Sequence, residues 1–375
     1  MINVKEVGAS GNGINDDSEA IQKALDIGGE IYIPSGDYRV KNTLKIGSDT
    51  VLTADKNARI FHCEQVKKRR GDFLLTNADF EKGNSNITVC GGIWDGNFDG
   101  KNNTKPANRY DKNGWSGSVI SFFNVKNLKL ADMRVANSVV YNMRFCCVDG
   151  FEIKNIEFSA RERSFNQDGL HFNGCCKNGI VENIRAVTKG QTNDDLVGLN
   201  CDDVFHTVEN MDFFGGDIEN ISFSKLYAED CHTLIRILSI DHSVRNITFS
   251  DIYAGIREFA FNMDGSRYCM DPLFDESEYP QGSGNIENVR IDNFTAYFTD
   301  PKRKCPLIDC ETRTKNLVIN GFKRLIEKEK PNSRVTLEAK NLVDTKIIFG
   351  EREYYLKDKT DILKTDDVGG FIKIN

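Results

Sequence analysis

Short stretches of alternating apolar and polar residues recur along most of the chain. Each carries an asparagine at or near its start and an apolar residue at every second position, as in NITVCGG from 86, NISFSKLYA from 220 and NITFSDIYA from 246. This period of two predicts β-strands rather than helices. Matching positions are 41, 23, 28, 42, 26, 42 and 28 residues apart, so the basic repeat is 23 to 28 residues and the longer intervals carry inserted loops.

Strands this short cannot bury a hydrophobic face alone, but stacked copies bury one continuous core. The repeat therefore predicts an all-β fold, a single-stranded right-handed parallel β-helix with asparagine over asparagine in successive coils. Asparagine suits the turn before each strand because it tolerates left-handed backbone geometry and forms local side-chain hydrogen bonds. A leucine-rich repeat is disfavoured because its L-x-x-L-x-L signature is absent, and a propeller because no blade motif recurs.

The ends of such a stack need caps, because open coils expose unpaired strand edges. The stretch INDDSEAIQKALDIGG predicts an N-terminal capping α-helix near 17–26, with Asp16 as its N-cap and Glu19 as the partner in a capping box. The apolar stripe of this helix is expected at Ala20, Ile21, Ala24 and Leu25.

The chain is expected to form a single β-helix domain over 1–375. Its parts would be an N-terminal cap segment at 1–40, coils at about 41–322 and a C-terminal cap at about 323–375, where the alternation is broken by charged residues.

Composition narrows the classes of function and the compartment. The 375 residues carry a formal net charge of −7, and no basic stripe is interleaved with aromatics, so nucleic acid is not expected as a partner. No apolar run is long enough to cross a membrane and no signal peptide is visible, so we expect a cytoplasmic protein. The 11 cysteines lack the paired spacing of a zinc site, and we expect reduced thiols, no metal and no cofactor. The oligomeric state is left open.

A resemblance to known proteins lies in the N-terminal stretch, which reads INVKEVGASGNGINDDSEAIQKALD and is followed by GGEIYIPSGDYRV. It resembles the first segment of right-handed β-helix pectin-degrading enzymes and of phage tail depolymerases. The resemblance implies the fold more strongly than the function.

Four strands further along can be aligned in one stack: DGLHF (168–172), DLVGL (195–199), TLIRI (233–237) and EFAFN (258–262). Two inward columns would then be formed by Leu170, Val197, Ile235 and Phe259, and by Phe172, Leu199, Ile237 and Phe261. The outward column between them would be His171, Gly198, Arg236 and Ala260. Asp168 and Asp195 each stand three residues ahead of that column, so they should share one cleft with Asp194.

This arrangement resembles the catalytic strands of the polygalacturonases, glycoside hydrolase family 28. That family carries N-T-D, G-D-D, G-H-G and R-I-K segments on successive coils; NQDG and NDDLVGL match the first two. On this resemblance Asp194 is the general acid, and Asp168 and Asp195 position and deprotonate a water molecule in an inverting hydrolysis. Crowding of three carboxylates should raise the pKa of one of them, as an acid catalyst near neutral pH requires.

Departures from the family pattern concern the substrate. His232 is the candidate for the family histidine but stands four residues before Arg236 rather than three, and Ala260 and Asn262 occupy the Arg and Lys positions of R-I-K. Those cations grip a uronate carboxylate in the family, so polygalacturonate is expected to be a poor substrate unless Arg236 or Arg257 takes over.

Several other residues are candidates for substrate contacts. His171 would bind a substrate hydroxyl or tune a neighbouring carboxyl group. Trp115 could stack on a sugar ring, although an ordinary loop anchor is an equal alternative, and His206 lies in an insertion that could wall the cleft. Asp202 and Asp203 would be a second acidic site, but a solvated loop is the favoured interpretation.

The sequence thus predicts a glycosidase that acts on an oligo- or polysaccharide through paired carboxylates. Inserted loops near 99–118, 201–217 and 266–284 would close the groove into a pocket, as exo action requires. The alternatives are a polysaccharide lyase or epimerase, in which calcium binding is left open, and a non-catalytic carbohydrate-binding β-helix of the phage-tail or adhesin type.

Overall fold

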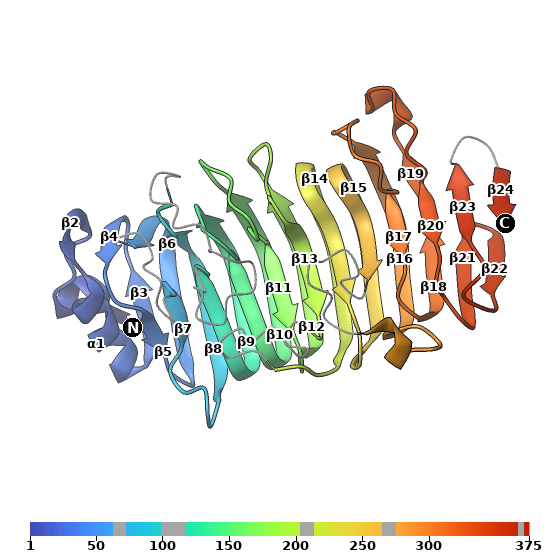
Figure 1. Ribbon diagram of the computed structural model, residues 1–375. Coiled ribbons are helices and arrows are strands. Elements are labelled where there is room, and N and C mark those ends of the chain that lie inside the picture. Colours follow the sequence, from blue (N-terminus) through green and yellow to red (C-terminus); the bar gives the residue numbers. More distant parts are fainter. Residues whose placement is uncertain (63–72, 99–117, 203–213, 265–274, 367–370, 375) are drawn as a thin grey trace.

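The computed structural model describes residues 1–62, 73–98, 118–202, 214–264, 275–366 and 371–374. Strands stack side by side from the helix at the N-terminal end to the last strands at the C-terminal end (Figure 1). The predicted parallel β-helix is confirmed, because successive strands pair in parallel from β1 with β3 to β18 with β21.

Twenty-four strands, one α-helix and three 3-10 helices make up the described chain. The N-terminal half contains β1 (Ile2–Asn3), η1 (Val4–Val7), β2 (Asn12–Asp16), α1 (Ser18–Ile27), β3 (Gly29–Ile33), β4 (Gly36–Val40), β5 (Leu44–Ile46), β6 (Thr50–His62), β7 (Leu75–Asn77), β8 (Asn84–Asp95), β9 (Ile120–Ala136), β10 (Met143–Ser159), β11 (Leu170–Asn173) and β12 (Lys177–Ala186). The C-terminal half contains β13 (Asp195–Asn200), β14 (Ile218–Leu238), β15 (Ser243–Asp264), η2 (Glu276–Glu278), β16 (Asn285–Phe298), β17 (Ile308–Cys310), β18 (Thr314–Asn320), β19 (Lys323–Arg324), η3 (Ile326–Lys328), β20 (Leu337–Ala339), β21 (Thr345–Phe349), β22 (Arg352–Leu356), β23 (Leu363–Asp366) and β24 (Phe371–Ile374).

One parallel sheet matters most for function, and we call it the site sheet. It runs through β5, β7, the first residues of β9 and β10, then β11, β13, the last residues of β14 and β15, and finally β17 and β20. Its buried side is a column of apolar residues: Leu75, Ile120, Met143, Leu170, Val197, Ile235, Phe261, Ile308 and Leu337.

The register of the fourth aligned strand differs from the prediction by two residues. Ile235 pairs with Phe261 and Arg236 with Asn262, so Asn262 rather than Ala260 continues the outward column after Arg236. Phe259 pairs with Thr233 instead, and Ala260 is fully buried. The first three strands have the predicted register, because Leu170 pairs with Val197 and Val197 with Ile235.

The repeated asparagines form ladders along the outside of the coils. Asn246 has φ 57°, donates from Nδ2 to Asn220 Oδ1 at 3.0 Å, and accepts from Asn288 Nδ2 at 3.1 Å. Asn316 continues the ladder by donating to Asn288 Oδ1 at 3.0 Å. This is the left-handed, side-chain-bonded turn that the sequence repeat predicted.

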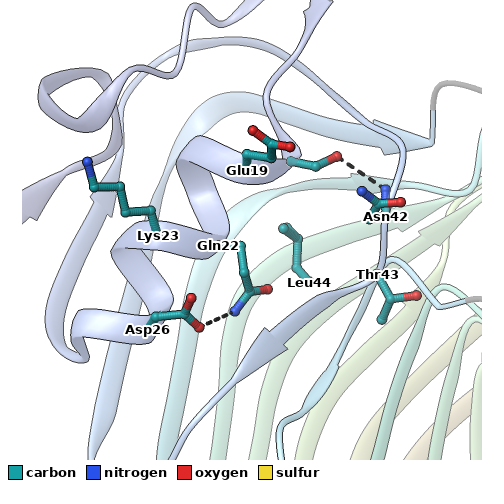
Figure 2. A pocket seen from close by; sticks show the side chains of 8 residues that line it. Glu19, Gln22, Lys23, Asp26, Asn42, Thr43 and Leu44 are labelled. Carbon is teal, nitrogen blue, oxygen red and sulfur yellow. Dashed lines mark hydrogen bonds between the residues drawn. The ribbon is translucent and has the colours of Figure 1, made fainter.

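Helix α1 covers the first coil, as expected, but it begins one residue later than predicted. The N-cap is Asp17 rather than Asp16, and the Asp17 carboxylate instead accepts the backbone N–H groups of Ser10 at 2.7 Å and Gly11 at 3.1 Å. Figure 2 shows a pocket between α1 and the segment 42–44 that leads into β5. Its volume is about 320 Å³. There Gln22 exchanges two hydrogen bonds of 2.9 Å with the backbone of Lys45, which fixes the helix to the coil.

The two cap segments contain more of the coil than the sequence boundaries implied. Within 1–40, β3 and β4 already pair in parallel with β6. Beyond 323, β20 and β21 continue the parallel coils, and only then do β22, β23 and β24 close the stack in antiparallel pairs. In the described parts of the chain, no helix is long and apolar enough to span a membrane.

Candidate active site

Three aspartates converge at one edge of the site sheet. Asp168 and Asp194 lie in the turns before β11 and β13, and Asp195 is the first residue of β13. One carboxylate oxygen of each lies within 4.8 Å of the others. Because Asp194 is in a bend rather than in a strand, the two adjacent side chains reach the same cleft.

Asp168 is held by the histidine three residues later. His171 Nδ1 lies 2.6 Å from Asp168 Oδ2, and the imidazole ring stacks on Tyr141 with 4.1 Å between centroids. His171 is only 2% exposed and Asp168 only 3%. The histidine is therefore placed to orient and tune the carboxylate, the second of the two roles expected for it.

The surroundings of Asp195 favour the protonated form of its carboxyl group. Burial raises its pKa well above the usual value, and the charges of Asp194 and Asp168 raise it further, while Arg236 and His232 act in the opposite direction. Gly198 lies beside these groups, since a Cβ there would lie 3.3 Å from His171 Nδ1 and 3.6 Å from Oδ2 of both Asp168 and Asp195.

His232 joins Asp194 to a carboxylate that sequence reasoning did not identify. Its Nδ1 lies 3.6 Å from Asp194 Oδ1, and its Nε2 lies 2.5 Å from Glu258 Oε2. Arg303 lies 3.1 Å from the other oxygen of Glu258, so the charges alternate along a row that ends at Asp194. Burial lowers the pKa of His232, but hydrogen bonds and charges from Asp194 and Glu258 outweigh burial and raise it to about 9.

A bulge in β14 explains how His232 reaches this position. The pairing of β14 with β15 shifts between Ala228 and Cys231 and again between Cys231 and Thr233. His232 falls in that irregularity, between Cys231 and Thr233, where β15 has one residue more than β14.

The two arginines proposed as substitutes for the family cations have other partners. Arg257 donates to the carbonyls of Asp230 at 2.6 Å and Thr192 at 3.3 Å and to Asn193 Oδ1 at 2.8 Å, so it supports the turn that carries Asp194. Arg236 lies 3.4 Å from Asp264 and its side chain is 11% exposed. Arg257 lines the groove described below, but its guanidinium group is already held by these three acceptors, and the side chain of Arg236 is largely buried.

The acids open into a groove of about 1110 Å³ that extends toward β20. Its lining includes Asp194, Asp195, His232, Glu258 and the exposed Phe165, and further along Asn262, Asp309, Glu311, Glu338 and Lys340. Burial raises the pKa of Asp309 to about 8, with Glu311 adding to the effect. Sequence reasoning missed Glu258, Phe165 and Asp309, although the alternation of β15 and β17 could have placed Asp309 in the outward column.

The remaining sequence candidates are Trp115, His206, Asp202 and Asp203. Trp115, His206 and Asp203 lie outside the described residues. Asp202 is buried rather than solvated: its Oδ2 accepts the backbone N–H groups of Ile240 and His242 at 2.6 and 3.1 Å, and its Oδ1 lies 2.5 Å from His242 Nδ1. Asp202 thus secures a turn.

The trio of Asp168, Asp194 and Asp195 is also where a divalent cation would fit, because carboxylate oxygens are the ligands that calcium and magnesium prefer. For hydrolysis, the same closeness bears on stereochemistry. Oxygens within 4.8 Å are closer than the about 6.5–9.5 Å between the carboxyl groups of inverting enzymes, so the expected inversion does not follow from this spacing.

Residues 1–257 match the family described as rhamnogalacturonase A/epimerase, pectate lyase-like. The chain belongs to this family. Its pectate lyase-like fold is the right-handed β-helix expected from the repeat, and the family includes carbohydrate-active enzymes by its own description.

The relatives of this chain are described in different ways. A pre-neck appendage protein of Bacillus phage B103 is 31% identical over 148 residues, which is 39% of this chain and 16% of that protein. The plasmin and fibronectin-binding protein A of Streptococcus pneumoniae is 36% identical over 81 residues, 20% of this chain and 11% of that protein. The chain thus spans at most 16% of these relatives' length.

Among solved structures, an exopolygalacturonase from Thermotoga maritima superposes with a TM-score of 0.61 over 96% of this chain and 94% of that one. At 14% identity this likeness shows the fold alone.

Proposed function

We propose that the protein hydrolyses a glycosidic bond of an oligo- or polysaccharide with Asp168, Asp194 and Asp195. The observation that supports this most is the clustering of three carboxylates within 4.8 Å at the side of a 1110 Å³ groove, with the pKa of one of them raised. Glycoside hydrolysis needs one protonated and one ionised carboxyl group at the scissile bond.

The electrostatics assign roles that differ from the family expectation. Asp195 is the proton donor to the leaving oxygen, because burial and two neighbouring acids favour its protonated form. Asp194 faces His232, whose pKa is raised to about 9, and Asp168 is oriented by His171. These two carboxylates serve the attacking water. The substrate is not primarily polygalacturonate, because the observed register places Asn262 and Asp264, not an Arg–Lys pair, at the corresponding positions of the fourth strand.

A second candidate is saccharide binding without catalysis. It is favoured by the relatives, since an appendage protein of a phage and a bacterial binding protein are among them. Binding alone gives no reason for a buried carboxyl group of raised pKa beside two others, so we rank it second.

The test is cleavage of a panel of oligosaccharides by the purified protein and by the Asp195→Asn variant. Hydrolysis by the wild type, lost in a variant that unfolds at the same temperature, supports the proposal. Binding without cleavage by both proteins supports the second candidate instead.

A further inference from the structure

Phe165 is an exposed aromatic side chain in a groove that many polar and charged residues line. It is 68% exposed and lies in the same lining as Asp194, Asp195 and Glu258. Binding sites for small molecules combine apolar or aromatic surface with a few polar groups that fix orientation. Phe165, together with the half-buried Phe259, supplies apolar surface in the groove that Asp194 and Asp195 line.

The loop that carries Phe165 is held firmly. Gln167 is fully buried and donates from Nε2 to the carbonyl oxygens of Ser138 at 2.6 Å and Glu162 at 3.2 Å. Its Oε1 accepts the backbone N–H of Ser164 at 2.8 Å. The side chain of Gln167 thus holds the backbone on both sides of Phe165, so the backbone that carries the ring is already in place before a ligand binds.

The same loop is tied to the segment that carries the acids. Asn193 donates from Nδ2 to the Ser164 carbonyl at 2.8 Å and accepts from Arg257 at 2.8 Å. Asn193 directly precedes Asp194 in the chain. One direct hydrogen bond, from Asn193 to Ser164, therefore ties the Phe165 loop to the segment of the acids, and Arg257 holds Asn193 in place.

We propose that Phe165 is the stacking platform of a sugar subsite next to the acids, and that its ligand is a pyranose with a contiguous apolar C–H face. The inference rests on the proposed function only for the saccharide nature of the ligand. One face of such a ring would cover the phenyl group, while its hydroxyl groups face the polar lining. Asn166, which also lines the groove, offers an amide to those hydroxyls.

The surroundings favour a sugar over another apolar surface. Arg163, Asp194, Glu258 and Arg303 line the same groove, and each carries a charge. A second protein copy or a lipid chain that covered Phe165 would remove these charges from water, which is costly without matching partners. A hydroxyl-rich ligand supplies hydrogen bonds to them.

The experiment measures binding to the Asp195→Asn protein, in which the saccharide stays intact. The probes are hexasaccharides of β-1,4-glucan, β-1,4-galactan, β-1,4-mannan, polygalacturonate and alginate, titrated by calorimetry. Adding Phe165→Ala should weaken the best-bound probe by about tenfold or more, the scale of about 1.4 kcal/mol. Phe165→Tyr should keep affinity within about twofold, and Phe165→Leu should give an intermediate loss because it is apolar but lacks a flat ring.

The matched control is Tyr355→Ala, since Tyr355 is an aromatic residue 55% exposed in β22, outside the groove lining. It should bind the probes as the parent does. Equal affinity of the Phe165→Ala and parent proteins overturns the inference, as does a lack of binding to every probe. A change of oligomeric state in Phe165→Ala without a change in affinity also overturns it and assigns the ring to a protein contact.

The outcome is separable from that of the proposed function. If binding depends on Phe165 but the wild type cleaves none of the probes, hydrolysis is wrong and the subsite stands. If the wild type cleaves a probe and Phe165→Ala changes neither KM nor affinity, the subsite is wrong and hydrolysis stands.

Discussion

Replacing Glu258 with glutamine should lower the pKa of His232. That pKa is raised from 6.5 to about 9, so at about 1.4 kcal/mol per pKa unit the site prefers the imidazolium by about 3 kcal/mol. Glu258 lies 2.5 Å from the ring and Asp194 3.6 Å, so Glu258 makes the closer contact. A carboxylate this near typically moves a pKa by about 1–3 units, and we expect a fall of about 1–2 in Glu258→Gln.

The assay is an NMR titration of the imidazole signals, which is practical because the chain has five histidines. A His232→Gln protein assigns the signal. Glu157→Gln is the control, because Glu157 pairs with Arg134 at 2.8 Å on the exposed side of the coils. A His232 pKa that stays near 9 in Glu258→Gln would refute the reasoning.

Stability should report the same interaction. The folded-state pKa of His232 lies above its usual 6.5, so its contribution is fully present below pH 6.5 and is lost as pH rises through about 9. The free energy of unfolding of the wild type, measured in urea, should therefore fall as pH rises across that window, and the fall should be smaller in Glu258→Gln. Equal declines in both proteins contradict the assignment.

Three further predictions concern the acids, metal dependence and the ladders. Replacing Asp168, Asp194 or Asp195 with asparagine should lower kcat by at least about 10²-fold while Tm is unchanged. The control Asp37→Asn should not change kcat. Near-normal turnover in two of the three variants would show that the trio is not the catalytic group. Because the pKa of Asp195 is raised, activity should persist above the usual range of a carboxyl group and fall as pH passes that raised value. Chelation with EDTA should leave the rate unchanged, and a rate restored only by calcium would favour a lyase. Asn246→Ala should lower the free energy of unfolding by about 1–3 kcal/mol, because it loses two ladder hydrogen bonds and strains a backbone at φ 57°; Asn246→Gly should lose less, and equal losses would deny the strain.

The fold was predictable because the same pattern, an asparagine followed by alternating apolar and polar residues, recurs in many coils. A position such as Asn246 or Asn288 fixes a left-handed turn, and the alternation that follows determines which side chains face the core. The predicted start of the helix depended on which of two adjacent aspartates is the N-cap. The prediction was wrong by one residue, because Asp17 is the N-cap of α1. The Asp17 carboxylate accepts hydrogen bonds from Ser10 and Gly11, contacts outside the helix.

The site was predictable only as far as its strands keep register. Asp168 and Asp195 follow from the regular pairing of β11 with β13. The fourth strand was placed two residues off although the 26-residue interval between Asn220 and Asn246 holds on both sides of the irregularity, as the pairs Ala228–Ala254 and Ile235–Phe261 show. The contact of Glu258 with His232 was missed because both residues lie at that irregularity, which has no clear sequence signal. Phe165 belongs to a turn whose orientation is set by Gln167 and Asn193, long-range contacts that no local pattern reveals.

The most direct test of the central claim is product analysis by mass spectrometry. Wild type and Asp195→Asn proteins would be incubated with the same saccharide panel in water enriched in oxygen-18. The account predicts shorter, saturated products that carry one labelled oxygen from the wild type, and a rate at least about 10² lower from the variant. Unsaturated products, an epimer of unchanged mass, or no product from the wild type would contradict hydrolysis at these three aspartates.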